Sequence, residues 1–153
     1  MAVYTKINKK EISYINKKFK IDKIINFKGI KQGIENTNYL LKSINKKFIL
    51  TIFEKRVVKK EIPFFMKLMD QLNNSKINCP RPIKNKNGDY LIKIKNKTAC
   101  IVSFLEGKDK KILNLKNCFE TGKIIAQMHQ ASKNYKLFRK NSMGVKNLNP
   151  LFN

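Results

Sequence analysis

Two glycines, Gly29 and Gly33, and a polar run, Asn36, Thr37 and Asn38, lie close together in the stretch FKGIKQGIENTNYLL at positions 27–41. Glycine between two strands lets the backbone approach a ligand closely. Successive backbone N–H groups, with polar side chains beside them, can then bind an anion such as phosphate. The spacing fits an ordinary hairpin loop equally well, so the spacing alone leaves both interpretations open.

A net charge of +24 makes nucleic-acid binding the first function class to consider. Only three of the 34 basic residues are arginine, however, namely Arg56, Arg81 and Arg139. Arginine is the side chain best suited to bidentate contacts with phosphate and guanine. The lysines are spread along the whole chain among many Asn and Ile residues, as on a solvated surface. We therefore expect no specific nucleic-acid partner, and only salt-sensitive binding to polyanions.

The hydrophobic fraction of 42% is sufficient to form a core. No apolar run approaches the length of a membrane span, and the first residues lack the apolar centre of a signal peptide. The sequence therefore predicts a cytoplasmic protein with no membrane partner. Cys79, Cys100 and Cys118 have spacings that fit neither a disulfide framework nor a zinc site, so we expect three partly buried thiols.

The first half of the chain has the pattern of a helix followed by an antiparallel sheet. Apolar residues at helical spacing predict a helix over 9–19. Runs rich in β-forming residues then predict strands at 21–29, 37–43 and 47–53. The glycine-containing segment lies between the first two strands, so it is expected to be the loop that joins them.

The second half alternates between helix and strand signals. One side of a predicted helix over 57–74 carries Ile62, Phe65, Met66, Met69 and Leu72. The pair Asn87-Gly88 is a strong hairpin signal and is expected to join a short strand near Ile83 to a strand at 89–94. The remaining elements are a strand at 98–104, a break at Gly107 and a helix over 117–132. This order predicts an α+β fold, a protein-kinase-like N-terminal lobe followed by the first helix of a second lobe.

Kinase-like folds usually carry a phosphate-binding Lys or Arg on the third strand, where this sequence has Thr51. By strand alternation Lys55 shares a face with Thr51, so Lys55 either reaches the phosphates or is a solvated residue at the strand end. Glu54 and Glu61 are candidate carboxylate partners for such a cation. Acidic residues near a helix N-terminus are also commonly explained by the helix dipole alone.

Six ordered segments carry a family resemblance: FKGIKQGIENTNYLL, FILTIFEKR, PFFMKLMDQL, CPRPI, ACIVSFLEGK and GKIIAQMH. In this order and spacing, they resemble bacterial homoserine kinases of the aminoglycoside-phosphotransferase-like type. The resemblance covers essentially the whole chain. It implies transfer of the γ-phosphate of ATP to the hydroxyl of L-homoserine, a step of threonine biosynthesis, with Mg²⁺ as a second cofactor.

The resemblance also implies a division of the chain. Residues 1–103 would form the N-terminal ATP-binding lobe, and 104–153 the hinge and the truncated start of a C-terminal lobe. Ser103 to Leu105 would offer backbone groups to adenine at the hinge, although a strand ending in a turn explains them too. The family places its catalytic residues and Mg²⁺ ligands in an H-x-D-x-x-x-x-N loop and a later Asp, and neither motif occurs here. We therefore expect an N-terminal part that is inactive alone, with no catalytic or metal residue.

Two alternatives remain open. Choline, methylthioribose, aminoglycoside and fructosamine kinases share the lobe plan, so the acceptor could differ. The chain could also be a noncatalytic nucleotide-binding fragment. We expect His129 to have a capping or packing role, and the apolar side of its helix, with Phe119, Ile125 and Met128, to be exposed.

Overall fold

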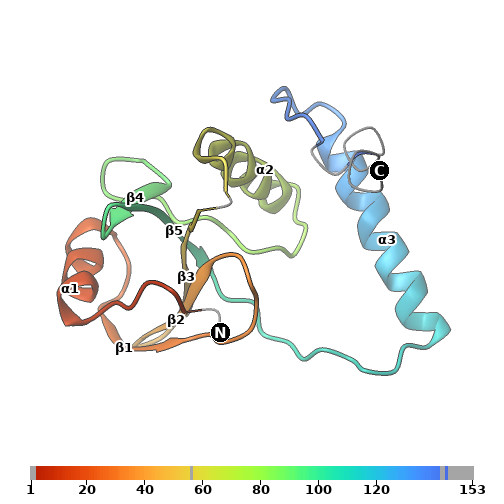
Figure 1. Ribbon diagram of the computed structural model, residues 1–153. Coiled ribbons are helices and arrows are strands. Elements are labelled where there is room, and N and C mark those ends of the chain that lie inside the picture. The colour runs from red at the N-terminus through yellow and green to blue at the C-terminus, as the bar shows by residue number, and fades with distance from the viewer. Residues whose placement is uncertain (1–2, 56, 142–143, 145–153) are drawn as a thin grey trace, which may run out of the picture.

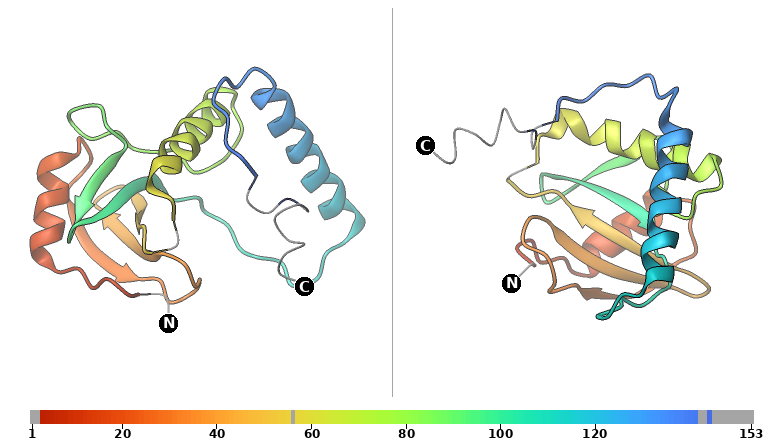
Figure 2. Two further views of the ribbon diagram at one scale, coloured as in Figure 1. Left: turned by 45° about the horizontal axis from the view of Figure 1, so that its top comes forward. Right: turned by 90° about the vertical axis from the view of Figure 1, so that its right-hand side faces the viewer.

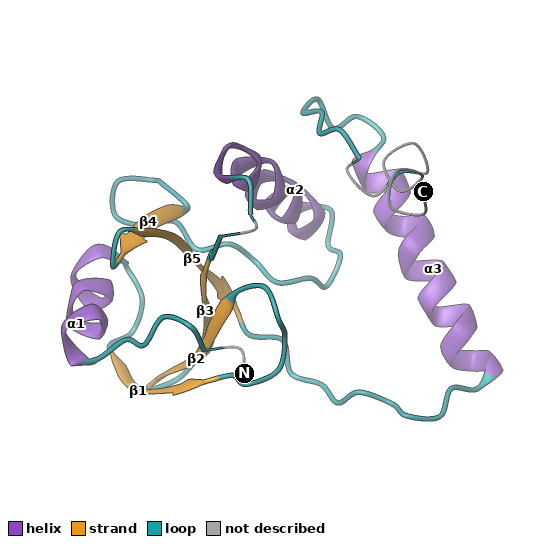
Figure 3. Cartoon of the chain, in the orientation of Figure 1, coloured by secondary structure: helices purple, strands orange, loops and turns teal. Residues whose placement is uncertain are grey.

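The computed structural model describes residues 3–55, 57–141 and 144. In chain order the elements are α1 (Lys9–Lys18), β1 (Ile24–Gly29), β2 (Thr37–Ser43), β3 (Lys47–Ile52), the 3₁₀ helix η1 (Lys59–Glu61), α2 (Ile62–Asn74), β4 (Leu91–Ile94), β5 (Lys97–Ser103) and α3 (Leu115–Ser132) (Figure 1). The strands form one antiparallel sheet in the order β1-β2-β3-β5-β4 (Figure 3). The predicted α+β class is therefore confirmed.

Helix α1 covers one face of the sheet. It begins at Asn8, whose side chain caps the Glu11 N–H while Glu11 bonds back to the Asn8 N–H, a reciprocal arrangement that stabilises the first turn. Its Ile12 and Ile15 are buried. They join a core formed by alternate residues of the strands, which include Tyr39, Leu41, Phe48, Leu50, Ile52, Ile92, Ile94, Ala99 and Ile101.

Helix α2 lies on the opposite side of the sheet from α1 (Figure 2). Its Ile62 and Met66 pack against Cys100 of β5, with Leu91 and Val102 at the edge of this smaller core.

Helix α2 does not cover the part of this sheet face that is formed by β1, β2 and β3. We call this part the open face. It includes Lys28, Asn38, Leu40, Ile49 and Thr51, and Val102 of β5 lies next to Ile49 at its edge.

Two sequence predictions in the second half of the chain are wrong. Asn87 and Gly88 form a turn, but the hairpin that joins β4 to β5 turns instead at Lys95 and Asn96, which have φ of 47° and 62°. The expected strand near Ile83 is absent from the described residues, which have two isolated bridges there, between Pro82 and Val102 and between Asn85 and Phe19. The Asn87-Gly88 pair indicates a local turn but not which strands pair, and β4 pairs with β5 across the turn at Lys95 and Asn96.

A further correction concerns the predicted helix over 57–74. The segment starts as η1 and becomes α-helical only at Ile62, with Pro63 in the first turn, where its missing N–H costs no hydrogen bond. Phe65, expected on the buried side, is 39% exposed. Its ring packs edge-on against Phe64 and under the guanidinium of Arg139.

Helix α3 stands apart from the sheet, at the end of a long extended connection. Its Phe119, Ile125 and Met128 are exposed, which confirms that expectation. Two polar contacts link this part of the chain to α2: Gln71 Nε2 donates to the Ala131 C=O at 2.7 Å, and the Tyr135 hydroxyl to the Phe64 C=O at 2.7 Å.

Two residues of α3 correct smaller predictions. Cys118 is exposed, although Cys79 and Cys100 are partly and fully buried as expected. His129 is also exposed, so the packing role expected of it is not observed. None of the helices in the described ranges is both long and apolar enough to cross a membrane. The predicted lobe boundary falls where β5 ends and stays a prediction, and most of the tail beyond Asn141 lies outside the described residues.

Candidate functional site

A row of three apolar side chains crosses the centre of the open face. Leu40 on β2 lies opposite Ile49 on β3, and Ile49 lies opposite Val102 on β5. All three are half-buried. The residues that precede and follow each of them in its strand point toward α1. These three side chains therefore form a flat apolar surface, close to the end of β5. The sequence prediction missed them, although the alternation within each strand was the available signal.

A polar pair lies beside the apolar row, on the side nearer the β1–β2 loop (residues 30–36). Thr51 Oγ1 donates a hydrogen bond of 2.8 Å to Asn38 Oδ1. Two of the predicted site residues are therefore brought together by the register of β2 and β3. The amide oxygen of Asn38 accepts this bond, and its NH₂ group is a donor for which the described residues provide no acceptor.

Gly33 lies at the tip of the β1–β2 loop, with φ of 97°. This left-handed conformation favours glycine, and a Cβ there would meet no atom within 4 Å. The loop is closed at its base by a hydrogen bond of 2.8 Å from the Ile30 N–H to the Asn38 C=O. The backbone at the tip is therefore accessible, which a loop that covers a ligand requires.

The structure gives a reason for glycine at position 29 that differs from the predicted approach to a ligand. A Cβ at this position would lie 2.9 Å from Val3 Cγ2 and 3.5 Å from the Tyr39 ring. The missing side chain therefore makes room for the N-terminal segment on the α1 side of the sheet. Any contact of Gly29 with a ligand stays a prediction and would be made by its backbone.

Thr37 points away from the open face, and its prediction as a side-chain donor to a ligand is wrong. The side chain is fully buried, and its hydroxyl donates to Glu54 Oε1 at 2.7 Å. Thr37 Oγ1 in turn accepts the N–H groups of Tyr4 and Thr5 at 3.0 and 3.1 Å. Asn36 is also engaged, because its Oδ1 accepts the Glu54 N–H at 3.3 Å.

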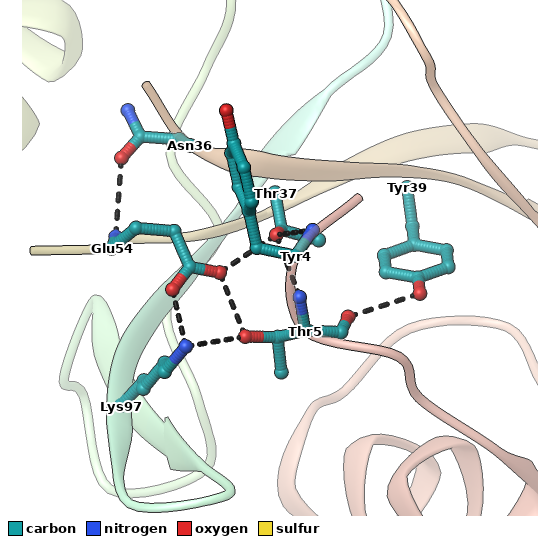
Figure 4. Close-up of polar contacts among 7 residues, drawn as sticks. All are labelled: Tyr4, Thr5, Asn36, Thr37, Tyr39, Glu54 and Lys97. Atoms are coloured by element: carbon teal, nitrogen blue, oxygen red, sulfur yellow. Dashed lines mark hydrogen bonds and ion pairs between the residues drawn. The ribbon is translucent and has the colours of Figure 1, made fainter. Parts of the chain in front are cut away.

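Figure 4 shows that Glu54 is the centre of this polar cluster, which comprises Thr5, Thr37, Glu54 and Lys97. Only 9% of the Glu54 side chain is exposed, and its carboxylate forms an ion pair with Lys97 at the start of β5. Burial alone would raise the pKa of Glu54. Hydrogen bonds from Lys97, Thr37 and Thr5, together with the Lys97 charge, outweigh that effect and hold the pKa below its ordinary value. Glu54 is therefore a charged group at neutral pH.

Glu54 and Glu61, the candidate carboxylate partners, form no clamp with a cation of the third strand among the described residues. Glu54 pairs with Lys97, and Glu61 pairs with Arg139, whose Nε lies 2.6 Å from Glu61 Oε2. In residues 3–55, 57–141 and 144, no ion pair joins β3 to α2. The position of Thr51 explains this, because a hydroxyl cannot replace the missing cation.

Lys55 does not share a strand face with Thr51, because β3 ends at Ile52 and Lys55 lies in the following turn. That expectation is wrong. Lys55 is exposed and lines a pocket together with Ile34 and Glu35 of the β1–β2 loop. A contact between Lys55 and phosphate stays a prediction.

The segment at the end of β5 has part of the backbone chemistry expected of a hinge. The N–H groups of Ser103 and Phe104 are already used, donating to the C=O groups of Arg81 and Lys47 at 2.9 and 3.2 Å. Within the described part of the chain, the N–H of Leu105 has no such acceptor. Of the donors predicted at Ser103 to Leu105, that of Leu105 is thus the one available to a ligand.

A divalent metal is not accommodated by these residues alone. Among the described residues, no group of three or more His, Cys, Asp or Glu side chains is placed to hold a metal ion. Glu54, the buried carboxylate nearest the loop, already forms an ion pair with Lys97.

Curated relatives match almost the whole chain. Over 152 residues the chain is 40% identical to a homoserine kinase of Parvibaculum lavamentivorans and 38% identical to one of Bradyrhizobium diazoefficiens. These alignments cover 99% of this chain but 47% and 46% of the relatives. The chain therefore spans about half the length of the curated relatives it matches.

Solved structures show the same fold at low sequence identity. A spectinomycin phosphotransferase in complex with ADP and spectinomycin superposes with a TM-score of 0.68 at 17% identity, over 90% of this chain and 43% of that one. A microcompartment-associated aminopropanol kinase gives 0.63 at 15% identity, over 89% and 43%. Both likenesses concern the fold alone.

The sequence also matches the profile of the phosphotransferase enzyme family over residues 26–149, from β1 through α3 and beyond. This range includes the β1–β2 loop, the open face and the hinge segment. The chain belongs to the phosphotransferase enzyme family.

Proposed function

We propose that this chain is the nucleotide-binding part of an ATP-dependent kinase that phosphorylates the side-chain hydroxyl of L-homoserine. The observation that carries the proposal is the match along 99% of the chain to proteins named homoserine kinase, at 40% and 38% identity. A cytoplasmic location and a place in threonine biosynthesis are parts of the same proposal.

The open face supports the nucleotide half of the proposal. The apolar row of Leu40, Ile49 and Val102 suits a flat aromatic base. The Leu105 N–H, shortly after Val102 in the chain, is a donor with no acceptor among the described residues. The β1–β2 loop with Gly33 at its tip lies at the other end of the face, where backbone N–H groups can cover phosphates. Asn38, next to the loop, adds a side-chain NH₂ donor.

The chemical step requires groups that these residues do not bring together. ATP supplies the phosphoryl group, and Mg²⁺ neutralises phosphate charge in kinases. The described residues offer no cluster of His, Cys, Asp or Glu side chains for Mg²⁺. This chain's own contribution is to bind the base, orient the phosphates and exclude water above them.

A kinase for another hydroxyl acceptor is the second candidate. The solved structures that share the fold are named for spectinomycin and aminopropanol, so one lobe plan serves chemically different acceptors. The open face selects for a nucleotide and contains no feature that selects among these acceptors. An activity assay must therefore make the distinction.

The test is an ADP-release assay on the protein expressed from its gene together with any codons that follow that of Asn153. L-Homoserine, choline and an aminoglycoside are compared as acceptors. We expect the highest kcat/KM with L-homoserine, and no phosphohomoserine from the 153 residues alone. Turnover with another acceptor and none with homoserine would overturn the assignment of the substrate.

A further inference from the structure

Figure 4 shows Tyr4 and Thr5 of the N-terminal segment (residues 3–7) beside Thr37, at the end of the β1–β2 loop. The segment lies on the side of the sheet opposite the open face. Val3 fills the space left by the missing side chain of Gly29. The Tyr4 hydroxyl then donates a hydrogen bond of 2.9 Å to the C=O of Ile34, close to the loop tip. A segment about 30 residues away in sequence therefore contacts the end of β1 and the far side of the loop.

The polar cluster fixes this segment to the end of the sheet. Thr5 and Thr37 both donate to Glu54 Oε1 at 2.7 Å, and Lys97 donates to Thr5 Oγ1 at 2.7 Å while pairing with the other carboxylate oxygen of Glu54. Asn36, the last residue of the loop, bonds to the Glu54 N–H. Glu54 thus joins the N-terminal segment, the start of β2 and the start of β5 through its carboxylate, and the last residue of the loop through its backbone N–H.

Without these contacts the loop tip has little support. Its base is closed by the single hydrogen bond from Ile30 to Asn38, and the space around Gly33 is open. Residues 31–35 are all exposed. Because a flexible loop must be ordered before it can hold phosphates, contacts that already order it reduce the entropic cost of binding.

We propose that the N-terminal segment and the polar cluster hold the β1–β2 loop in its phosphate-covering shape, which makes Tyr4 and Glu54 positioning residues for the phosphates. Neither side chain belongs to the open face; both residues line the pocket beside Ile34 and Glu35 of the loop, and both bond to loop residues. We therefore assign their effect on the phosphates to the loop. The proposal rests on the proposed function for its ligand. It predicts that these residues affect binding of the phosphates and leave binding of the nucleoside unchanged.

The experiment compares Tyr4→Phe and Glu54→Gln with the unaltered 153-residue chain. Tyr14→Phe is the matched control, because the Tyr14 hydroxyl on α1 makes no hydrogen bond with the described residues. Amide order parameters measured by NMR report the motion of residues 31–35, and calorimetry gives the affinities for ADP and for adenosine. We expect lower order parameters in the loop for both variants. We also expect ADP binding to weaken by about three- to ten-fold while adenosine binding stays within about two-fold.

Each outcome has a definite meaning. Unchanged loop order parameters in both variants would overturn the proposal, whatever the affinities. Equal losses for ADP and adenosine would also overturn it, because they would indicate general damage to the fold. If the unaltered chain binds neither ligand, the proposed nucleotide site fails, while the order parameters still decide whether the N-terminal segment holds the loop.

Discussion

Ile49→Glu is expected to weaken ADP binding by at least about ten-fold, which corresponds to about 1.4 kcal/mol. Ile49 lies at the centre of the apolar row, between Leu40 and Val102. A carboxylate there would have to lose its hydration against the base and would repel the phosphates nearby. Ile49 is half-buried and belongs to neither core cluster, so the sheet should still form. Calorimetric titration with ADP measures the effect.

Ile25→Glu is the matched control for this experiment. Ile25 is an isoleucine on the edge strand β1, and 65% of it is exposed. It carries the same change in charge, so any general effect of a lower net charge on anion binding appears in both variants. Equal weakening by the two substitutions would contradict a site on the open face and would indicate nonspecific attraction of ADP to a basic surface.

Thr37→Val is expected to reduce the free energy of unfolding by about 2–4 kcal/mol. The substitution keeps the shape of the side chain but removes a fully buried hydroxyl. The N–H groups of Tyr4 and Thr5 would lose their acceptor, and Glu54 would lose a donor. Buried groups left without partners each cost about 1–3 kcal/mol, and costs within one cluster are not additive. Denaturant unfolding followed by circular dichroism gives the difference.

Thr51→Val provides the comparison, because it is the same substitution on the adjacent strand. Thr51 is half-buried, and its hydroxyl donates to Asn38. Water can replace that hydrogen bond, so the loss should stay below about 1 kcal/mol. Similar losses for the two variants would show that the polar cluster contributes nothing beyond an ordinary exposed hydrogen bond.

The strands were predictable from the sequence because their apolar patterns are strong and local. The bounds of β2 agree with the prediction at both ends, and those of β3 and β5 agree to within a residue. The hairpin at Asn87 and Gly88 failed for the opposite reason. A good turn signal does not show which strands pair, and β4 pairs with β5 across Lys95 and Asn96.

The candidate site was harder to predict because its residues face in two directions. Asn36, Thr37 and Asn38 are consecutive polar residues, and the sequence does not show that Thr37 turns inward while Asn38 turns outward. That direction depends on Glu54 and on Tyr4, which are 17 and 33 residues away. Lys97, the actual partner of Glu54, is 43 residues away. Spacing rules within one element could not have found these contacts.

The most direct test of the central claim, a nucleotide site on the open face, is a map of amide chemical-shift changes during titration of the 153-residue chain with ADP. The largest changes are expected in the β1–β2 loop, at Asn38, Ile49 and Thr51, and from Val102 to Leu105. They should persist at a salt concentration that suppresses nonspecific binding to lysines. Changes scattered over the lysine-bearing surface of α1, and lost on addition of salt, would contradict the claim.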